Sequence, residues 1–531
     1  MKLAQLPPVA GTTLWSMLAA AVVAFGAMAH AETVLKVIPH ADLKNLDPIW
    51  TTAYITRNHG YLIYDTLFAM DEELKPQPQM VEKWQVSGDK LTYTFTLRDG
   101  LKWHDGAPVK AEDCVASLQR WGKRDGMGQR LMGFIASLTP VDDKTFKMVL
   151  KEPYGLVLES IGKLSSNVPF MMPMRLAATD PFKQVPETIG SGPFKFVKDE
   201  WVPGSKVVYM KNADYVPRKE LPSAAAGGKI AKVDKIEWLY IPDQQTAMNA
   251  LISGEVDYFE NPQHDLVPIL KQTPGIVVEQ LDPLGNQGML RMNHLLPPFD
   301  KPEVRQAVLH LIDQKTYLQA AVGNPEYYKV CYSLFACGTT FATEEGYDEY
   351  KKRNLEKAKA LIKQAGYEGY KVVIMQPTDI PITSAASLVT AQNLREAGFT
   401  VEVQAMDWST LTSRRSKKDP VDQGGWNIFH TWWIGGDISN PISHAGLSGG
   451  GPDKAWFGWP SDPKIEELRD AFAKETDLDK RKALAAEIQA RALAIGTHGN
   501  FGTWFNPVAY RDNIQGVIKS PVQFFWNIEK K

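Results

Sequence analysis

The chain has 531 residues, of which 44% are hydrophobic and 23% are charged. This is the composition of a globular protein, and the length exceeds what one hydrophobic core usually spans, so two or three domains are expected. The formal net charge is -2, so there is no basic excess to neutralise a phosphate backbone. Nucleic acid is therefore not an expected partner.

The first 31 residues predict a secretory signal peptide. Lys2 is their only charged residue, residues 14–28 form an apolar run, and Ala29-His30-Ala31 fits a small-x-small cleavage site. A membrane anchor is the alternative, but the run is short for a spanning helix and polar sequence follows from Glu32 onward. No cysteine is close enough to this site to carry a lipid. We therefore expect cleavage after Ala31 and export of a chain that is not lipid-anchored.

Strand and helix patterns alternate along the rest of the chain. Residues 91–98 alternate apolar and polar side chains before a turn, which predicts one strand of a hairpin. A helix over residues 111–121 and a strand over residues 145–150 extend this α+β region. Another helix is expected from Asp300, as its N-cap, toward Leu318.

A β-α-β pattern occurs in the second half. Residues 370–376 and 399–406 are strand-like, and the helical segment 383–397 lies between them. Such a crossover joins two parallel strands of one sheet. The sequence therefore predicts a parallel strand pair in this half of the chain.

Three cysteines are present: Cys114 in a predicted helix, and Cys331 and Cys337 in a predicted loop. Export to an oxidising compartment favours a disulfide between Cys331 and Cys337. The alternative is two free thiols, because this spacing does not guarantee the Cα separation that a disulfide needs.

Residues 81–84 and the longer segment 91–106 closely resemble the signature segment of the extracellular solute-binding protein family 5, the peptide/nickel type. Further similar pieces follow in the family's order, namely Leu46-Asp47-Pro48, residues 190–194 and residues 299–307. The resemblance covers nearly the whole chain after the signal peptide.

This resemblance implies an α/β fold, a two-lobed periplasmic-binding-protein clamshell with an extra α+β subdomain in lobe one. It also implies a monomeric periplasmic receptor that performs no chemistry, uses no cofactor and delivers a di- or oligopeptide to an ABC permease in the inner membrane. The alternative ligand is a metal chelate, an opine or another charged small molecule. The implied parts are the signal peptide (1–31), lobe one (32–65, 186–288 and 503–531), its extra subdomain (66–185) and lobe two (289–502).

The same resemblance suggests a ligand anchor in the Trp-rich segment 431–441. Peptide-binding relatives neutralise the ligand's terminal ammonium with an aspartate in an Asp-x-x-x-Pro arrangement, which Asp437 matches when counted back from Pro441. Counted forward from Trp433, the family spacing reaches Gly436, so this chain has one extra residue. The alternative is that Asp437 only caps a turn in a Gly-rich loop.

Aromatic side chains are the expected walls of the site, because binding pockets are mostly apolar. Trp426, Trp432 and Trp433 are candidates, and neighbours on an extended strand face opposite ways, so we favour Trp433 over Trp432. Tyr54 resembles a position from which relatives line the cleft, and core packing is its alternative. Four arginines are available for a ligand carboxylate, and the sequence leaves the choice open: Arg291, Arg395, Arg414 and Arg415.

One sequence pattern resembles the motif of a hydrolase. Residues 446–450 match the G-x-S-x-G nucleophile elbow, which needs a strand before Ser448 and a helix after it. Gly451-Pro452 follows, so no such helix is expected. The ten histidines form no H-E-x-x-H pair, so no metal site is expected. A secreted hydrolase, the third alternative, would need a base and an oriented nucleophile that the sequence does not assemble.

Overall fold

The computed structural model describes residues 32–475 and 477–531. The signal peptide predicted over residues 1–31 lies outside the described residues. Thr33–Lys531 form one compact unit, whose larger sheets have seven, six and four strands. In the described part of the chain, no helix combines the length and the apolar character needed to span a membrane.

The seven-stranded sheet is built from three distant parts of the chain. Its central strand β1 (Val34–Ile38) is parallel to both of its neighbours, and the remaining pairs are antiparallel. Leu35 and Val37 of β1 are fully buried. The strand order is β12 (Ile276–Gln280), β19 (Pro507–Arg511), β11 (Tyr258–Phe259), β1, β10 (Lys235–Leu239), β9 (Lys206–Lys211) and β8 (Phe194–Phe196).

The six-stranded sheet contains the predicted β-α-β unit. Strand β15 (Lys371–Pro377) is parallel to β16 (Thr400–Met406), and α11 (Pro381–Glu396) connects them, so the predicted parallel pair is confirmed. All seven residues of the central β13 (Asn286–Met292) are buried. The strand order is β14 (Tyr328–Lys329), β18 (Gly499–Trp504), β13, β17 (Ile428–Ile434), β15 and β16.

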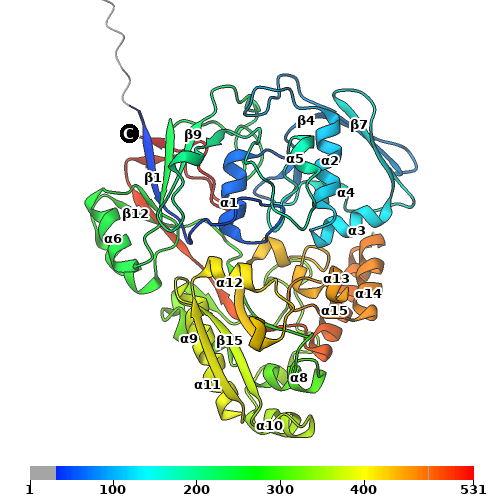
Figure 1. The fold of residues 1–531 in the computed structure, drawn as a ribbon, viewed down its shortest axis with the longest axis vertical. Helices are drawn as coiled ribbons and strands as arrows, with labels where there is room; N and C mark the ends of the chain where they lie inside the picture. The colour runs from blue at the N-terminus through cyan, green and yellow to red at the C-terminus, as the bar shows by residue number, and fades with distance from the viewer. Residues whose placement is uncertain (1–31, 476) are drawn as a thin grey trace, which may run out of the picture. The chain divides into compact units, whose positions relative to one another are not determined.

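The four-stranded sheet is antiparallel throughout and accounts for the predicted α+β region. Helix α2 (Ala111–Trp121) packs against two of its strands, and in Figure 1 it lies together with α3 (Gly126–Phe134) and α4 (Val157–Ile161) beside β4 and β7. The bounds of α2 and β7 are those predicted from the sequence. The strand order is β4 (Val81–Val86), β5 (Thr92–Leu97), β7 (Thr145–Leu150) and β6 (Ile135–Pro140).

The described chain passes between the two large sheets at two short crossings. Residues 281–285 join β12 to β13, and residues 505–506 join β18 to β19. The boundaries implied after residues 288 and 502 therefore fall inside strands, a few residues from the change of sheet. Since hydrogen-bonded strands resist bending, short crossings of this kind are where two sheets can move relative to each other.

The single helix predicted from Asp300 toward Leu318 is wrong in extent. The structure has two helices, α8 (Pro302–Leu311) and α9 (Gln314–Ala321). Lys301 rather than Asp300 is the N-cap of α8, and the backbone of Ile312 is extended (φ -81°, ψ 117°). Asp313, also extended, is the N-cap of α9, and its carboxylate accepts a hydrogen bond from the Thr316 hydroxyl.

Candidate ligand-binding site

Tyr54 connects the first helix to the loop that follows β17. It is the first residue of α1 (Tyr54–Ile63), a helix in which every residue is buried. Its hydroxyl donates to Asp437 Oδ2 at 2.7 Å and accepts from the Ile434 amide at 2.9 Å. Burial and the charge of Asp437 raise the pKa of Tyr54 well above its usual value, so the phenol remains protonated and acts as a donor.

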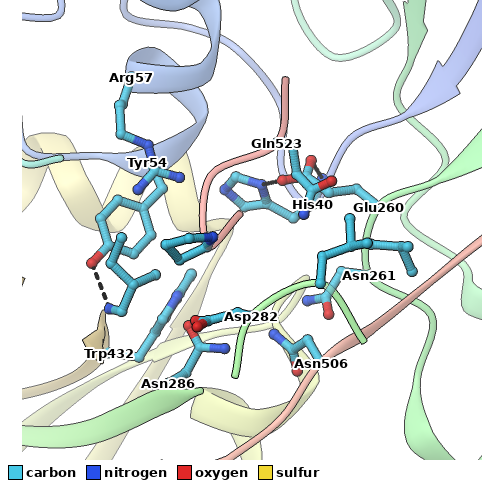
Figure 2. Close-up of a pocket in the computed structure, with 14 residues that line it drawn as sticks. His40, Tyr54, Arg57, Glu260, Asn261, Asp282, Asn286, Trp432, Asn506 and Gln523 are labelled. Carbon is cyan, nitrogen blue, oxygen red and sulfur yellow. Dashed lines mark hydrogen bonds and ion pairs between the residues drawn. The ribbon is translucent and has the colours of Figure 1, made fainter. Parts of the chain in front are cut away.

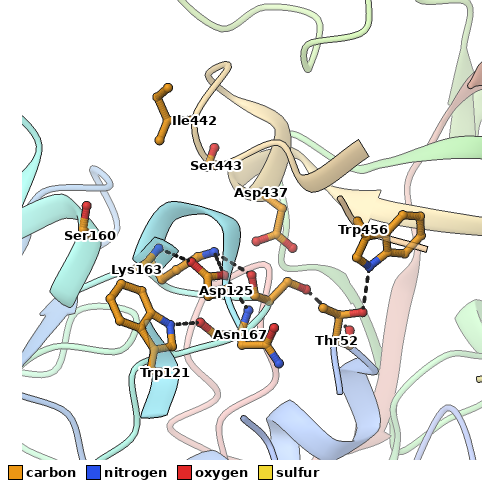
Figure 3. Close-up of polar contacts among 12 residues, drawn as sticks. Thr52, Trp121, Asp125, Ser160, Lys163, Asn167, Asp437, Ile442, Ser443 and Trp456 are labelled. Carbon is orange, nitrogen blue, oxygen red and sulfur yellow. Dashed lines mark hydrogen bonds and ion pairs between the residues drawn. The ribbon is translucent and has the colours of Figure 1, made fainter. Parts of the chain in front are cut away.

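Asp437 lies in η6 (Gly435–Ile438) and is 3% exposed. Burial raises the pKa of its carboxyl, although the charge of Lys163 and the Tyr54 hydrogen bond oppose this rise. Figure 3 shows the carboxylate pointing toward the segment that carries Lys163, whose ammonium is held by Asp125 Oδ2 at 2.7 Å. Asp437 is therefore a buried carboxylate that accepts a hydrogen bond from a neutral donor, and it lines neither of the two cavities described below.

A cavity of about 70 Å³ adjoins Tyr54, and both crossings contribute to its wall. We call it the crossing cavity. Asp282 comes from the first crossing and Asn506 from the second, while Tyr54 and Trp432 close one side (Figure 2). Its polar lining consists of His40, Tyr54, Arg57, Glu260, Asn261, Asp282, Asn286, Asn506 and Gln523.

Three buried polar atoms on this wall have no hydrogen-bond partner within residues 32–475 and 477–531: His40 Nε2, Asp282 Oδ2 and Asn506 Oδ1. The other oxygen of Asp282 accepts from the Leu284 amide at 2.9 Å. Burial raises the pKa of Asp282 to about 6, although hydrogen bonds to backbone amides oppose the rise. The other acid, Glu260, accepts from His40 Nδ1 at 2.8 Å. Asp282 is thus the carboxylate left with an open acceptor.

Arg57 contributes a buried cation to the same wall. Its guanidinium carbon lies 4.1 Å from the centroid of the Tyr54 ring, and its donors go to the neutral acceptors Asn58 Oδ1 and Ser165 Oγ. Burial lowers the pKa of Arg57. The sequence analysis missed Arg57, Asp282 and Asn506, since no motif marks them and their chain positions are far apart.

A second cavity, of about 10 Å³, is lined by Arg415, and we call it the Arg415 cavity. The guanidinium donates to Thr52 Oγ1 at 2.9 Å and lies over the rings of Phe457 (4.8 Å) and Trp456 (5.4 Å). Burial lowers the pKa of Arg415 to about 9, and no carboxylate of the described residues lies within 4.0 Å of it. The lining residues are Thr52, Tyr54, Trp408, Arg415, Thr431, Trp432, Trp433 and Trp456.

The three candidate tryptophans have different environments. Trp432 lines both cavities, whereas Trp433 is 3% exposed, donates to Met289 Sδ and lines only the Arg415 cavity. Both tryptophans therefore line the Arg415 cavity, and Trp432 in addition lines the crossing cavity. Trp426 is fully buried and donates to the Arg415 carbonyl, so it belongs to the core.

The four candidate arginines also have different environments. Arg291 is fully buried, and its donors go to backbone carbonyls. Arg414 also donates to backbone carbonyls, and Arg395 lies on the exposed side of α11. Arg415 is the one of these four that lines either cavity.

Cys331 and Cys337 are joined by a disulfide, with their Cα atoms 5.9 Å apart, and Cys114 is a buried free thiol. The bridged loop also contacts η6, the turn that carries Asp437, which we call the anchor turn. The Ala336 amide donates to the Ile438 carbonyl at 3.2 Å. The disulfide therefore restrains the loop against which η6 rests.

The expectation that no helix follows the G-x-S-x-G segment is wrong. The four-residue helix α13 (Gly451–Lys454) begins directly after it, because proline is tolerated in the first turn of a helix. Ser448 is nevertheless preceded by the 3-10 helix η7 (Ala445–Leu447) rather than by a strand. The segment therefore lacks the strand–turn–helix arrangement of a nucleophile elbow.

Comparison with known proteins identifies the family of this chain. The family model of bacterial extracellular solute-binding proteins, family 5 (middle region), matches residues 75–455. A Sinorhizobium fredii protein named a probable peptide ABC transporter periplasmic-binding protein is 44% identical over 492 residues, which is 92% of each chain.

Two solved structures share the fold. An A. tumefaciens periplasmic binding protein in complex with agropinic acid has a TM-score of 0.78 at 21% identity, covering 94% of this chain and 99% of its own. The ABC transporter-associated periplasmic binding protein DppA from Helicobacter pylori, in complex with the peptide STSA, has a TM-score of 0.77 at 22% identity, covering 94% of this chain and 98% of its own. The expected α/β fold of the two-lobed periplasmic binding proteins is confirmed. The chain belongs to the bacterial extracellular solute-binding proteins, family 5.

Proposed function

We propose that this protein is the periplasmic substrate-binding component of an ABC importer, which captures a di- or oligopeptide and delivers it to an inner-membrane permease. The 44% identical relative carries a peptide-transport name. The proposal rests on two buried groups of opposite charge that lie near Tyr54 and Trp432 and do not pair with each other. The unpaired cation Arg415 lies on one side, and the carboxylate of Asp437 is bonded to Tyr54. Buried opposite charges suit the two ends of a zwitterionic peptide.

The proposed capture mechanism is closure about the two crossings. Lobe one would comprise residues 32–280 and 507–531, including the extra subdomain over 66–185, and lobe two residues 286–504. Side chains of these two parts are in direct contact: Tyr54 with Asp437 at 2.7 Å and Tyr240 with Asp379 at 2.8 Å. A ligand that adds contacts available only in this closed arrangement shifts the equilibrium toward it. The permease would then recognise the closed form.

The Arg415 cavity of about 10 Å³ has room for about one water, so the ligand would enter while the lobes are apart. Its α-ammonium would then replace the Tyr54 hydroxyl on Asp437, and its carboxylate would pair with Arg415. Both side chains are at most 3% exposed, so water does not screen these bonds. Charge-assisted hydrogen bonds in such an environment are stronger than neutral ones. Trp432, whose ring lies 5.9 Å from that of Tyr54, would supply the apolar wall between the two ends.

Native mass spectrometry of the purified protein tests this proposal, followed by mass identification of what denaturation releases. A ladder of short peptides is the expected result, with peptide binding then measured by calorimetry. One discrete non-peptide mass, such as an opine or a metal chelate, would overturn the peptide assignment and keep the receptor role.

We also propose that the protein is exported as a monomer that starts at Glu32 and carries no lipid. The apolar run and the Ala29-His30-Ala31 site support cleavage at this point. Intact mass of the periplasmic fraction should give the mass of residues 32–531. A larger mass that retains the first 31 residues would contradict cleavage.

A further inference from the structure

The crossing cavity contains a carboxylate that the protein itself leaves unsatisfied. Asp282 Oδ2 is shielded from solvent and has no partner among the described residues, and the same is true of Asn506 Oδ1. Both side chains line the cavity and come from different crossings (Figure 2). Buried polar atoms are nearly always hydrogen-bonded, because each unsatisfied group costs about 1–3 kcal/mol. Two open acceptors on one cavity wall therefore indicate a missing donor.

The charges around the cavity determine what kind of donor fits. Glu260 is satisfied by the His40 ring, the His40 amide and the Asn58 amide. Arg57 is satisfied by neutral acceptors. The wall therefore carries two carboxylates, Glu260 and Asp282, against the one guanidinium of Arg57, which leaves one negative charge in excess. A group that carries several N–H donors and a positive charge complements this wall.

We infer that the crossing cavity is a subsite for a primary ammonium group of the ligand. The N–H groups of this ammonium would donate hydrogen bonds to Asp282 Oδ2 and Asn506 Oδ1. This inference rests on the proposed function and extends it to ligand selectivity. The cavity volume of about 70 Å³ is several times the roughly 10–15 Å³ that one bound water requires, so a small ammonium group fits. Tyr54 and Trp432 line this cavity and the Arg415 cavity, so the two cavities are adjacent.

The position of the subsite couples it to closure. Asp282 belongs to the crossing over 281–285 and Asn506 to the crossing over 505–506, and these are the segments about which the lobes would rotate. An ammonium held by both residues contacts both crossings in the closed form. Its binding energy favours closure if opening separates Asp282 from Asn506, because only contacts that differ between the two forms shift their equilibrium.

Calorimetry with Ala-Lys-Ala tests the subsite in the wild type, in Asp282→Asn and in the control Asp479→Asn. The Asn variant keeps an oxygen acceptor for the Leu284 amide, and the control removes an equal charge from a side chain that is 92% exposed. We expect the affinity to fall at least tenfold in Asp282→Asn and to remain unchanged in the control. Equal affinity in all three proteins would overturn the subsite.

Acetylated ligands distinguish the two sources of the ammonium. If the lysine side chain occupies the cavity, Nε-acetylation should abolish the difference between the wild type and Asp282→Asn, whereas Nα-acetylation should preserve it. The reverse pattern would show that the α-ammonium occupies the cavity. A difference that survives both modifications would overturn the ammonium assignment.

A second probe separates this inference from the proposed function. n-Propylammonium is titrated while tryptophan fluorescence is followed, since Trp432 lines the cavity. Saturable quenching that is lost in Asp282→Asn and weakened in Asn506→Ala supports the subsite even for a protein that binds no peptide. The absence of saturable quenching in the wild type, together with peptide binding that does not depend on Asp282, would refute the subsite and leave the peptide receptor intact.

Discussion

The Tyr54 hydroxyl donates to Asp437 at 2.7 Å and at the same time accepts from the Ile434 amide at 2.9 Å. Tyr54 and Asp437 are 383 residues apart in the chain. One side chain from α1 thus satisfies the carboxylate of the anchor turn and a backbone donor at the end of β17. Exchange of this hydroxyl for a ligand ammonium is the event on which peptide capture would depend.

Tyr54→Phe should destabilise the ligand-free protein by about 1–3 kcal/mol, because it leaves two buried polar groups without their partner. Urea unfolding measures this difference, and Tyr370→Phe, at a ring that is 38% exposed, is the control. An unchanged unfolding free energy would show that the Tyr54 hydroxyl contributes no net stability.

Asp437→Asn should weaken the binding of a free peptide by about 2 kcal/mol, or roughly 30-fold, since the charge-assisted bond to its α-ammonium is lost. The same peptide with an acetylated amino terminus should bind the variant and the wild type equally well. Calorimetry measures both. Unchanged affinity for the free peptide would remove Asp437 from the site.

Arg415→Met should have opposite effects on stability and on binding. The variant removes a buried cation that lacks a carboxylate partner among the described residues, so the ligand-free protein should melt at the same or a higher temperature. Its affinity for peptides should fall, while its affinity for their carboxy-terminal amides should match that of the wild type. A loss of affinity shared equally by acids and amides would argue against a role in carboxylate recognition.

The raised pKa of Asp282 predicts a pH dependence of stability. Its carboxyl has a pKa of about 6 when folded and near 3.8 when unperturbed, so the folded chain binds more protons between these values. The contribution of Asp282 to stability is therefore present at low pH and is lost as the pH rises through about 6. The other charged and titratable groups that line the same cavity are His40, Tyr54, Arg57 and Glu260.

Urea unfolding from pH 4 to pH 7 tests this dependence. The unfolding free energy of the wild type minus that of Asp282→Asn should decrease as the pH rises. Ligand ammonium binding should show the opposite trend and strengthen above pH 6, where the carboxylate is charged. Parallel stability profiles for the two proteins would contradict the raised pKa.

The disulfide predicts a specific labelling pattern. Alkylation of the denatured protein should modify Cys114 alone before reduction, with Cys331 and Cys337 in addition after it, as read from intact mass. Replacing both bridged cysteines by alanine should cost about 2 kcal/mol of stability, because the bridge closes a short loop of the unfolded chain. Equal labelling with and without reductant would contradict the bridge.

Local elements were predictable where the pattern was strong. The bounds of α2 and β7, and the crossover through α11, follow from apolar periodicity, because one face of each element is buried. The interruption between α8 and α9 was not predictable, since Ile312 continues the apolar pattern although its backbone and that of Asp313 are extended. Likewise, the alternation along β17 did not show that Trp432 and Trp433 both line the Arg415 cavity.

The sequence by itself determined the family and the parallel β-α-β unit, because these depend on contiguous residues. It also indicated Tyr54, Asp437 and the Trp-rich segment 431–441 as candidates for the site. Only the tertiary structure decided which polar groups lie together and which lack partners. Asp282 and Asn506 are 224 residues apart and share a cavity because the chain crosses between the sheets twice. Whether a buried polar group has a partner depends on all the residues that pack around it in the folded chain, so no local sequence pattern predicts it.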